Sequence, residues 1–528
     1  MQTQVLIIGA GVTGTGLARD LSLRGVSSVV VEKKDVNAGA SGGNHGLLHS
    51  GARYISSDPA AATECHIENQ ILKKLAPHTI ESTGGLFVAV AGDDENYIAD
   101  FPAMCRKSHI PLQLLDLTEV REMEPTLSDK VIAAYALDDA TIDPFKLSLD
   151  NMADASGRGA QLRRYCQVTA FEVDQGRICR TTVVDRVTGK TESIEAEVVV
   201  NASGSWAGEV AALAGVPIEM RYSKGSLLVT QNRLAARVIN RLRPPTDGDI
   251  LVPGGTVSIL GTTSERVDSP DVIYPEVHEV DAIIDQGAAM IPELATTRYI
   301  RAYCGVRPLL GGVQTSAGDS DRTVSRGFAL IDHAKEQGGP TNFITITSGK
   351  LTTYRLMAEK TANLVCARLG VEAACRTHLE PLPDTVDARW TEPGLAPNVW
   401  LRQNVPGDVL LCECEMVPQS VVEEIANRVR MLDGRPSLKS IGLRSRIGKG
   451  PCQGAFCSQR LAAYLYDRQH VRGRRGISQL RSFLRERWRG QQPLLWDLPL
   501  AQAELLEAMH CGLFGLELEN RDDAHPER

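Results

Sequence analysis

Four cysteines near the end of the chain have the spacing needed to hold a metal cluster. Cys412 and Cys414 form a C-x-C pair, and Cys452 and Cys457 form a C-x4-C pair. Thirty-seven residues separate the two pairs, and the other eight cysteines are scattered singly. Two close pairs of thiolates can each bind one iron of a [2Fe–2S] cluster. Zinc sites also use four thiolates, but C-x-C is tighter than their usual spacing. We therefore expect an iron–sulfur cluster, with zinc or incidental cysteines as the alternatives. Disulfides have little support, because no signal peptide is visible.

A glycine-rich turn at the start of the chain predicts a dinucleotide site. The apolar residues 4–8 lead directly into a G-x-G-x-x-G sequence, and a helix is expected from about Thr13 to Arg24. Gly9 permits the tight turn, Gly11 lets the backbone approach a pyrophosphate, and Gly14 allows the helix to pack closely on the strand. Glu32 ends the next expected strand, where a carboxylate can bind ribose hydroxyls. A tight turn without a ligand is the alternative.

Several cations at the expected ends of loops could bind an anionic substrate. Arg53, Arg307, Arg326 and Lys350 each lie within two residues of a glycine. A phosphate dianion needs several cations and favours the bidentate geometry of arginine, whereas one or two cations satisfy a carboxylate. Ordinary salt bridges are the alternative role for these side chains.

Two histidines lie close to Arg53 and are candidates for proton transfer. An imidazole titrates near neutral pH, so His49, four residues before Arg53, is our candidate general base. His45 is the rival candidate, and either ring could instead pack against a cofactor.

Length and composition limit the class of protein. A chain of 528 residues is expected to form two to four domains. Its 43% hydrophobic content is ordinary for an α/β protein, and no run approaches the ~20 apolar residues of a membrane span. A net charge of −8 argues against nucleic acid as a partner. The first strand begins almost at Met1, so we expect no signal peptide and a cytoplasmic location.

The elements around these residues predict how they are positioned. Residues 39–46 extend the nucleotide unit with a glycine-rich segment that contains Ser41. A buried strand ends at residues 201–204, where Gly204 allows the chain to pass close to a cofactor. A turn that contains Gly349 precedes a helix near residue 354, and Thr352 either bonds the ring edge of a cofactor or caps that helix. Residues 218–310 are rich in strands without helices between them, which favours an antiparallel substrate sheet beside the nucleotide domain.

The last third of the chain has a different character. Five prolines in residues 376–406 indicate that residues 376–405 are a linker. Residues 418–429 carry valines and an isoleucine on one face of an expected helix. Residues 463–528 are expected to be mostly helical. Their arginine-rich part indicates a solvated face or, less well, a docking surface.

Three further motifs carry a resemblance to a known family. They are G-A-S-G-G-N-H-G-L-L-H-S-G-A-R-Y at residues 39–54, R-A-Y-C-G-V-R-P at residues 301–308 and S-G-K-L-T-T-Y-R at residues 348–355. Together with the glycine turn they resemble the FAD-dependent glycerol-3-phosphate dehydrogenases over nearly the whole chain. The cysteine segment resembles a [2Fe–2S] domain of the bacterioferritin-associated-ferredoxin type. Ser348 stands where the family usually has glycine.

The resemblance implies a site and a fold. It implies that Arg53, Tyr54, Arg307, Arg326 and Lys350 contact the substrate, with His49, Arg307 and Lys350 acting in catalysis. It also implies an α/β fold: a Rossmann-type FAD-binding domain with an antiparallel, amino-acid-oxidase-like substrate domain at residues 1–375. The linker at 376–405, the cluster domain at 406–462 and the helical region at 463–528 would follow.

The resemblance further implies a reaction and partners. The expected reaction is oxidation of sn-glycerol 3-phosphate to dihydroxyacetone phosphate, with hydride passing to FAD and electrons leaving through the [2Fe–2S] cluster to quinone. Two partners, a second flavoprotein and a membrane-anchoring iron–sulfur protein, would receive them, which places the chain at the inner face of the cell membrane. The alternatives are an FAD dehydrogenase of a 2-hydroxy acid and a non-catalytic iron–sulfur carrier.

Overall fold

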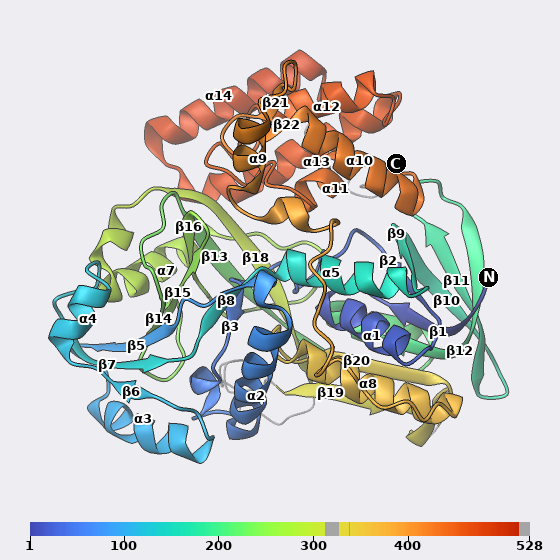
Figure 1. Ribbon diagram of the computed structural model, residues 1–528, viewed down its shortest axis with the longest axis horizontal. Coiled ribbons are helices and arrows are strands. Elements are labelled where there is room, and N and C mark those ends of the chain that lie inside the picture. Colours follow the sequence, from blue (N-terminus) through green and yellow to red (C-terminus); the bar gives the residue numbers. More distant parts are fainter. Residues whose placement is uncertain (312–326, 337, 517–528) are drawn as a thin grey trace.

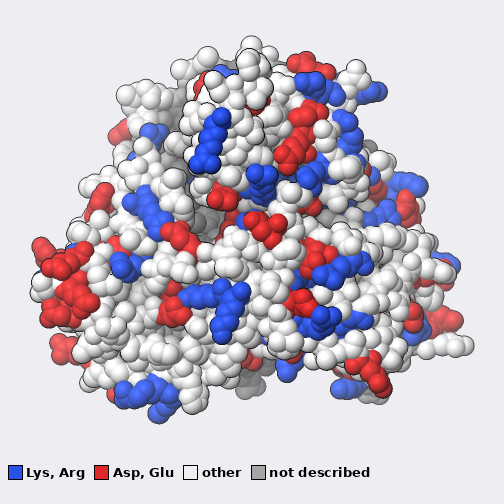
Figure 2. Space-filling view, in the orientation of Figure 1, with Lys and Arg blue, Asp and Glu red and all other residues white. Residues whose placement is uncertain are grey.

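The computed structural model describes residues 1–311, 327–336 and 338–516 (Figure 1). Arg326 lies outside these ranges. Two sheet domains lie side by side and the C-terminal helices cover one end of both (Figure 1). Acidic and basic side chains are interspersed over the face shown in Figure 2. The expected combination of a Rossmann-type domain, an antiparallel substrate sheet and a helical C-terminal region is confirmed.

The first domain is built on a parallel sheet that begins at the first residues of the chain. The strands β9, β2, β1, β12 and β20 are parallel neighbours in that order, and β19 pairs antiparallel with β20. Helices α1, α5 and α8 pack together on one face. An antiparallel meander of β10 and β11 extends the sheet from β12. The bounds are β1 Gln2–Ile8, α1 Val12–Leu23, β2 Ser28–Glu32, α5 Pro144–Gly157, β9 Gln161–Arg164, β10 Cys166–Asp174, β11 Arg177–Asp185, β12 Thr191–Asn201, β19 Phe328–Asp332, β20 Phe343–Ser348 and α8 Tyr354–Leu369.

The second domain is a nine-stranded sheet, antiparallel at every described pair except β14 with β5. Its longest pairing joins β13 to β18. Helix α7 covers one face, and the buried side chains of α7 and the strands form a common core. The strands are β5 Gly85–Val90, β6 Gln113–Leu114, β7 Val131–Leu137, β13 Met220–Thr230, β14 Val238–Arg241, β15 Ile250–Gly254, β16 Val257–Gly261, β17 Glu265–Val267 and β18 Tyr299–Leu310, and α7 spans Val277–Met290.

Smaller elements connect the two domains. A three-stranded sheet of β3 Leu47–Leu48, β4 Ile80–Glu81 and β8 Ala140–Ile142 lies between them in sequence. The remaining helices of this part are α2 Pro59–Leu75, α3 Glu95–Lys107, α4 Leu117–Met123 and α6 Ala207–Leu213.

The C-terminal region has a hydrophobic core of its own. The expected helical face of residues 418–429 is present: Val421, Val422, Ile425 and Val429 of α10 are buried. The segment 376–405 contains a helix, α9, whose Ala396 joins the same core, so this segment is more ordered than its prolines indicate. The elements are α9 Leu395–Gln403, β21 Leu410–Cys412, β22 Val417–Pro418, α10 Gln419–Asp433, α11 Leu438–Leu443, α12 Cys457–Asp467, α13 Arg474–Gln491 and α14 Asp497–Phe514.

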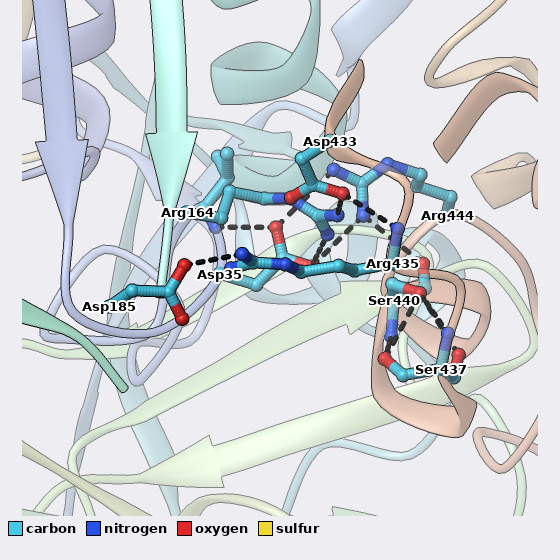
Figure 3. A network of polar contacts seen from close by, with 9 residues as sticks. Asp35, Arg164, Asp185, Asp433, Arg435, Ser437, Ser440 and Arg444 are labelled. Atoms are coloured by element: carbon cyan, nitrogen blue, oxygen red, sulfur yellow. Dashed lines mark hydrogen bonds and ion pairs between the residues drawn. The ribbon is translucent and has the colours of Figure 1, made fainter. Parts of the chain in front are cut away.

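A buried ionic network fastens this region to the nucleotide-binding domain (Figure 3). Arg164, at the end of β9, donates to Asp35 (2.6 Å) and makes two bonds to Asp433 at the end of α10 (2.6 and 2.9 Å). Arg444, just after α11, donates to both oxygens of Asp35 (3.1 and 3.3 Å). Burial raises the pKa of Asp35, but Arg444 and Arg164 outweigh it and hold that pKa below its ordinary value. The cysteine region is therefore held by charges that are costly to separate.

Within the described residues, every helix is too short or too polar to cross a membrane.

Candidate functional site

A cavity of about 590 Å³ lies where the two sheet domains meet. Its wall combines the glycine turn after β1, the end of β2, the loop 39–46, residues from β13 and β18, and the turn after β20. The carboxyl ends of parallel strands commonly open into such a crevice, because the backbone there turns into loops and helix N-termini.

At one end of the cavity the backbone has the form of a dinucleotide site. Gly9 has φ of +109° and lies so close to Ala202 that a Cβ would collide with its carbonyl oxygen (2.6 Å). Gly11 caps the start of α1, and the Ser41 hydroxyl accepts a hydrogen bond from the Val12 amide (3.0 Å). Glu32 accepts from the Ala10 amide (2.9 Å), and burial raises the pKa of its carboxyl. Gly9, Gly11, Glu32 and Ser41 all line the cavity.

Two of the expected cofactor residues lie behind the wall instead of in it. A Cβ on Gly14 would collide with the Gly9 carbonyl oxygen, so this glycine permits the close packing of α1 on the turn. Thr352 is fully buried, and its hydroxyl accepts from the His49 amide (3.1 Å). Gly204 and Gly349 do line the cavity.

The expected cations lie at the other end of the cavity, apart from Arg326, which is not described. The Arg307 guanidinium donates to the Thr263 carbonyl oxygen (3.1 Å) and to the Thr262 hydroxyl. It fills the space over Gly225, where a Cβ would collide with it. The Lys350 ammonium lies 4.5 Å from the centre of the Tyr54 ring. These cations come from β18 and from the turn after β20.

A carboxylate faces Arg53. Its guanidinium donates to Asp249 (2.6 Å), and both side chains are buried. Although burial raises the pKa of Asp249, Arg53 and Arg243 lower it below the ordinary value. Arg53 still lines the cavity, but its charge is largely offset.

Both histidines line the cavity and are held in the neutral form. Burial, with Arg307 and Arg53 nearby, lowers the pKa of His45 to about 3. Burial also lowers the pKa of His49 well below the ordinary value, and His45, Lys350 and Arg53 add to this effect. The His49 Nε2 atom lies 3.3 Å from the Tyr54 hydroxyl. A neutral imidazole can accept a proton, so His49 and Tyr54 form a pair through which a proton can move.

Features of the wall match a bound flavin nucleotide. Gly43 and Gly305 approach so closely that a Cβ on either would collide with the other backbone. Among the described residues, the His45 Nδ1 and Ser348 Oγ atoms are buried without a hydrogen-bond partner, although buried polar atoms normally have one. A cofactor with polar ring edges would supply those partners, so the residues present fit FAD.

Sequence reasoning missed part of this wall. Residues Cys166–Thr169 of β10 line the nucleotide end, and Trp206 stacks under the Lys33 ammonium (3.8 Å). Thr262, which holds Arg307, and Asp249, which holds Arg53, were also missed. Each of these residues is brought to the site because segments far apart in the sequence lie side by side in the fold, and no local sequence motif predicts their positions. Thr353 and Tyr354 begin α8, and Tyr354 packs under α1 against Gly16.

The four cysteines of the C-terminal region are brought together as expected. They line a hollow of about 310 Å³ with Glu413 and Phe456. The Cys412 and Cys414 sulfurs are 3.8 Å apart, and those of Cys414 and Cys452 are 3.5 Å apart. Four cysteine sulfurs around one hollow are a donor set that fits a metal centre. Both a four-thiolate zinc site and a [2Fe–2S] cluster suit these donors.

Comparison with protein families and curated proteins gives consistent matches. The model of the FAD dependent oxidoreductase family matches residues 4–362. The A subunit of the anaerobic glycerol-3-phosphate dehydrogenase of Escherichia coli K12 is 40% identical over 540 residues, covering 98% of both chains. The A1 subunit of the corresponding enzyme of Haloferax volcanii is 37% identical, covering 98% of this chain and 91% of the relative.

Solved structures agree with the fold. The glycerol-3-phosphate dehydrogenase from Bacillus halodurans complexed with FAD has a TM-score of 0.65 at 21% identity, covering 94% of this chain and 96% of that one. The L-alpha-glycerophosphate oxidase from Mycoplasma pneumoniae with FAD bound has a TM-score of 0.58 at 18% identity, covering 69% and 95%.

Proposed function

The chain belongs to the FAD dependent oxidoreductase family and, within it, to the catalytic chains of anaerobic glycerol-3-phosphate dehydrogenase, and on this premise we propose that it oxidises sn-glycerol 3-phosphate to dihydroxyacetone phosphate. One observation carries the proposal. Two cations, Arg307 and Lys350, and the neutral His49 share a cavity with a complete dinucleotide turn. This arrangement can hold an anion at one point while it removes a proton at another.

The cations position the substrate. Arg307 is held from behind by Thr262 and Thr263, so its planar fork is pre-organised for a phosphate. Lys350 adds a second charge on the opposite wall, from the turn after β20. Arg53 contributes less charge because Asp249 faces it, and its main role is to fix the segment that carries His49 and Tyr54. Binding the phosphate at these points aligns the secondary alcohol for reaction.

Proton transfer falls to His49. Oxidation of a secondary alcohol removes a proton from oxygen and a hydride from carbon, and bound FAD accepts the hydride. The neutral imidazole of His49 accepts the proton, and the Tyr54 hydroxyl beside Nε2 can pass it onward. The low pKa of His49 keeps the accepting form populated at neutral pH.

The cysteine site is the electron exit. Cys412, Cys414, Cys452 and Cys457 would hold a [2Fe–2S] cluster, which takes electrons one at a time. The tight C-x-C pair favours this cluster over zinc, as its spacing is shorter than that of zinc sites. The division into residues 1–375, 376–405, 406–462 and 463–528 follows from this assignment, although α9 ties the second segment to the third.

Partners and location follow from the same assignment. The curated relatives are named as one lettered component of a larger enzyme, so other components are expected to accompany this chain. We propose that a second flavoprotein and a membrane-anchoring iron–sulfur protein take the electrons to quinone. The chain would then lie at the inner face of the cell membrane, attached through them.

The test is anaerobic spectroscopy of the purified chain. Glycerol 3-phosphate is expected to bleach the flavin absorbance within one turnover, and then to change the absorbance of the cluster. A 2-hydroxy acid serves as the comparison, because its carboxylate can also be bound by arginine and lysine side chains. Bleaching by lactate and not by glycerol 3-phosphate would contradict the proposal.

A further inference from the structure

Helix α14 presents an apolar face to solvent. Leu498, Leu505, Met509 and Leu513 are 60 to 74% exposed, and their spacing of seven, four and four places them on one side of the helix. Trp496, just before the helix, is 73% exposed. In Figure 2 the surface over α14, at the upper left, has few charged side chains. Exposed apolar patches of this kind mark interaction sites.

The inward face of the same helix carries polar as well as apolar side chains: Cys511 and Phe514 pack against the C-terminal core. Glu507 and His510 are buried. The Gln459 side-chain amide donates to the Nε2 atom of His510 (2.5 Å). An amphipathic helix that turns its leucines outward is expected where something else covers them.

The inner face of α14 also places this patch beside the cysteine site. Gln459 is the third residue of α12, which begins at the cluster ligand Cys457. Phe483 of the intervening helix α13 packs against Gly454, between Cys452 and Cys457. A protein bound to α14 would therefore lie about one helix diameter, ~10 Å, from the segments that carry these cysteines.

Charge argues against a lipid surface and against a second copy of the chain. Helices that lie on membranes carry Lys and Arg on their polar face, whereas the charged residues of α14 are Asp497, Glu504 and Glu507. In a symmetric pair of antiparallel α14 helices, Leu505 near the middle would face its copy and bring the two Glu504 carboxylates together. The exposed acids Asp497 and Glu504 beside the patch instead suit a partner with basic side chains around an apolar surface.

We propose that Trp496 and the apolar face of α14 are the docking surface for the partner protein that accepts electrons, which presents an apolar groove or helix with a basic rim. The proposal rests on the proposed function, since it takes the four cysteines as the electron exit. Tryptophan, leucine and methionine at the centre and acids at the edge give the anatomy of a protein interface.

The test uses the full-length, cofactor-loaded chain, and its probe is the co-expressed membrane-anchoring iron–sulfur protein. The double variant Leu505→Glu and Leu513→Glu is expected to lower the amount of co-purified probe at least about tenfold, because two charges would have to be desolvated in the contact. Met431→Glu, at an 80% exposed position near the end of α10, is the matched control and should bind as the unaltered chain does. Flavin and cluster absorbance check that each variant has folded. The milder pair Leu505→Gln and Leu513→Gln is measured in parallel.

Undiminished binding of the probe by both double variants would overturn the proposal. Two other results would also overturn it: a dimer of the isolated chain in sedimentation that the glutamate pair dissociates, or flotation with phosphatidylethanolamine–phosphatidylglycerol vesicles that the same pair abolishes. A chain that binds the probe through α14 but is not bleached by glycerol 3-phosphate contradicts the proposed function alone, and leaves the docking surface supported.

Discussion

The cavity between the sheets and the cysteine hollow are constructed differently, and the proposed function gives them different tasks. In the cavity, Arg53 is backed by Asp249, Arg307 by two threonines, and glycines bring the backbones into contact. At the cysteine site, Cys412 ends β21 and Cys457 begins α12, Cys414 is exposed and Phe456 is 62% exposed. The first site encloses its ligand, and the second lies open at its edge.

Under the proposed function, this difference separates the oxidation of the substrate from the transfer of electrons to a partner. Moving a hydride and a proton requires fixed charges and excluded water, which burial and a rigid wall provide. Handing over electrons requires an accessible edge on which a partner can dock. The ionic network of Arg164, Asp35, Asp433 and Arg444 joins the C-terminal region to the nucleotide-binding domain (Figure 3).

The largest expected effect comes from removing a cysteine ligand. Cys412→Ser is expected to abolish the visible absorbance of the cluster and reduce quinone-linked turnover to background, since a serine oxygen is a poor iron ligand in such a cluster. Flavin reduction by glycerol 3-phosphate in a single turnover should persist. Loss of flavin reduction as well would show that the two sites are not separable.

Arg307→Ala tests the enclosed site. Removing a half-buried, pre-organised cation is expected to lower kcat/KM by on the order of 10²–10³, mainly through a higher KM, from a loss of roughly 3–4 kcal/mol. The FAD content measured by absorbance should not change. Unaltered steady-state kinetics with glycerol 3-phosphate would remove Arg307 from the site.

Arg164→Met tests the connection between the regions. It leaves Asp433 without its bidentate partner and is expected to destabilise the folded chain by about 3 kcal/mol, measured by urea unfolding. Arg435→Met is the control, because Arg435 is partly exposed and should contribute less than about 1 kcal/mol. In stopped-flow experiments Arg164→Met should slow cluster reduction and leave flavin reduction unchanged. Equal loss of both rates would argue that the network supports the whole molecule.

The smallest effect concerns pH and His45. In the unfolded chain His45 binds a proton below about pH 6.5, but in the folded chain its pKa is about 3. The unfolded state therefore gains protons first, and stability is lost as pH falls from 6.5 towards 3, by up to about 1.4 kcal/mol per pH unit. His45→Gln should reduce the stability lost between pH 7 and pH 5.5 by about 1 kcal/mol, measured from urea midpoints. An unchanged pH dependence would mean that His45 is solvated in the folded chain.

The sequence predicts best where function depends on neighbours along the chain. The turn of Gly9, Gly11 and Gly14 and the buried face of α10 follow from local spacing, and both have the expected form in the structure. The cations could be expected near one another because several short motifs resembled one family. Asp249 opposite Arg53 could not, because nothing near either residue indicates the pairing.

The same limit explains α9 and α14. Prolines mark residues 376–405 as a linker, yet Ala396 finds a place in the core that β21 and α10 build later in the chain. On α14 apolar residues occur all round the helix, so the spacing alone does not show which of them face solvent. Tertiary packing determines which face of a helix turns inward, and helix propensity alone does not predict that orientation.

The contact between Gly43 and Gly305 bears on the order of assembly during synthesis. The nucleotide turn and the loop 39–46 leave the ribosome early, whereas β18, which carries Gly305, follows much later. The cavity acquires its later walls only when β18 pairs with β13 and the turn after β20 is in place, so a large cofactor can be captured by the early half and then enclosed by the late one. Once the contact between Gly43 and Gly305 has formed, release of the cofactor requires these two backbone segments to separate. This favours a cofactor that is retained for the lifetime of the protein over one that is exchanged with each turnover.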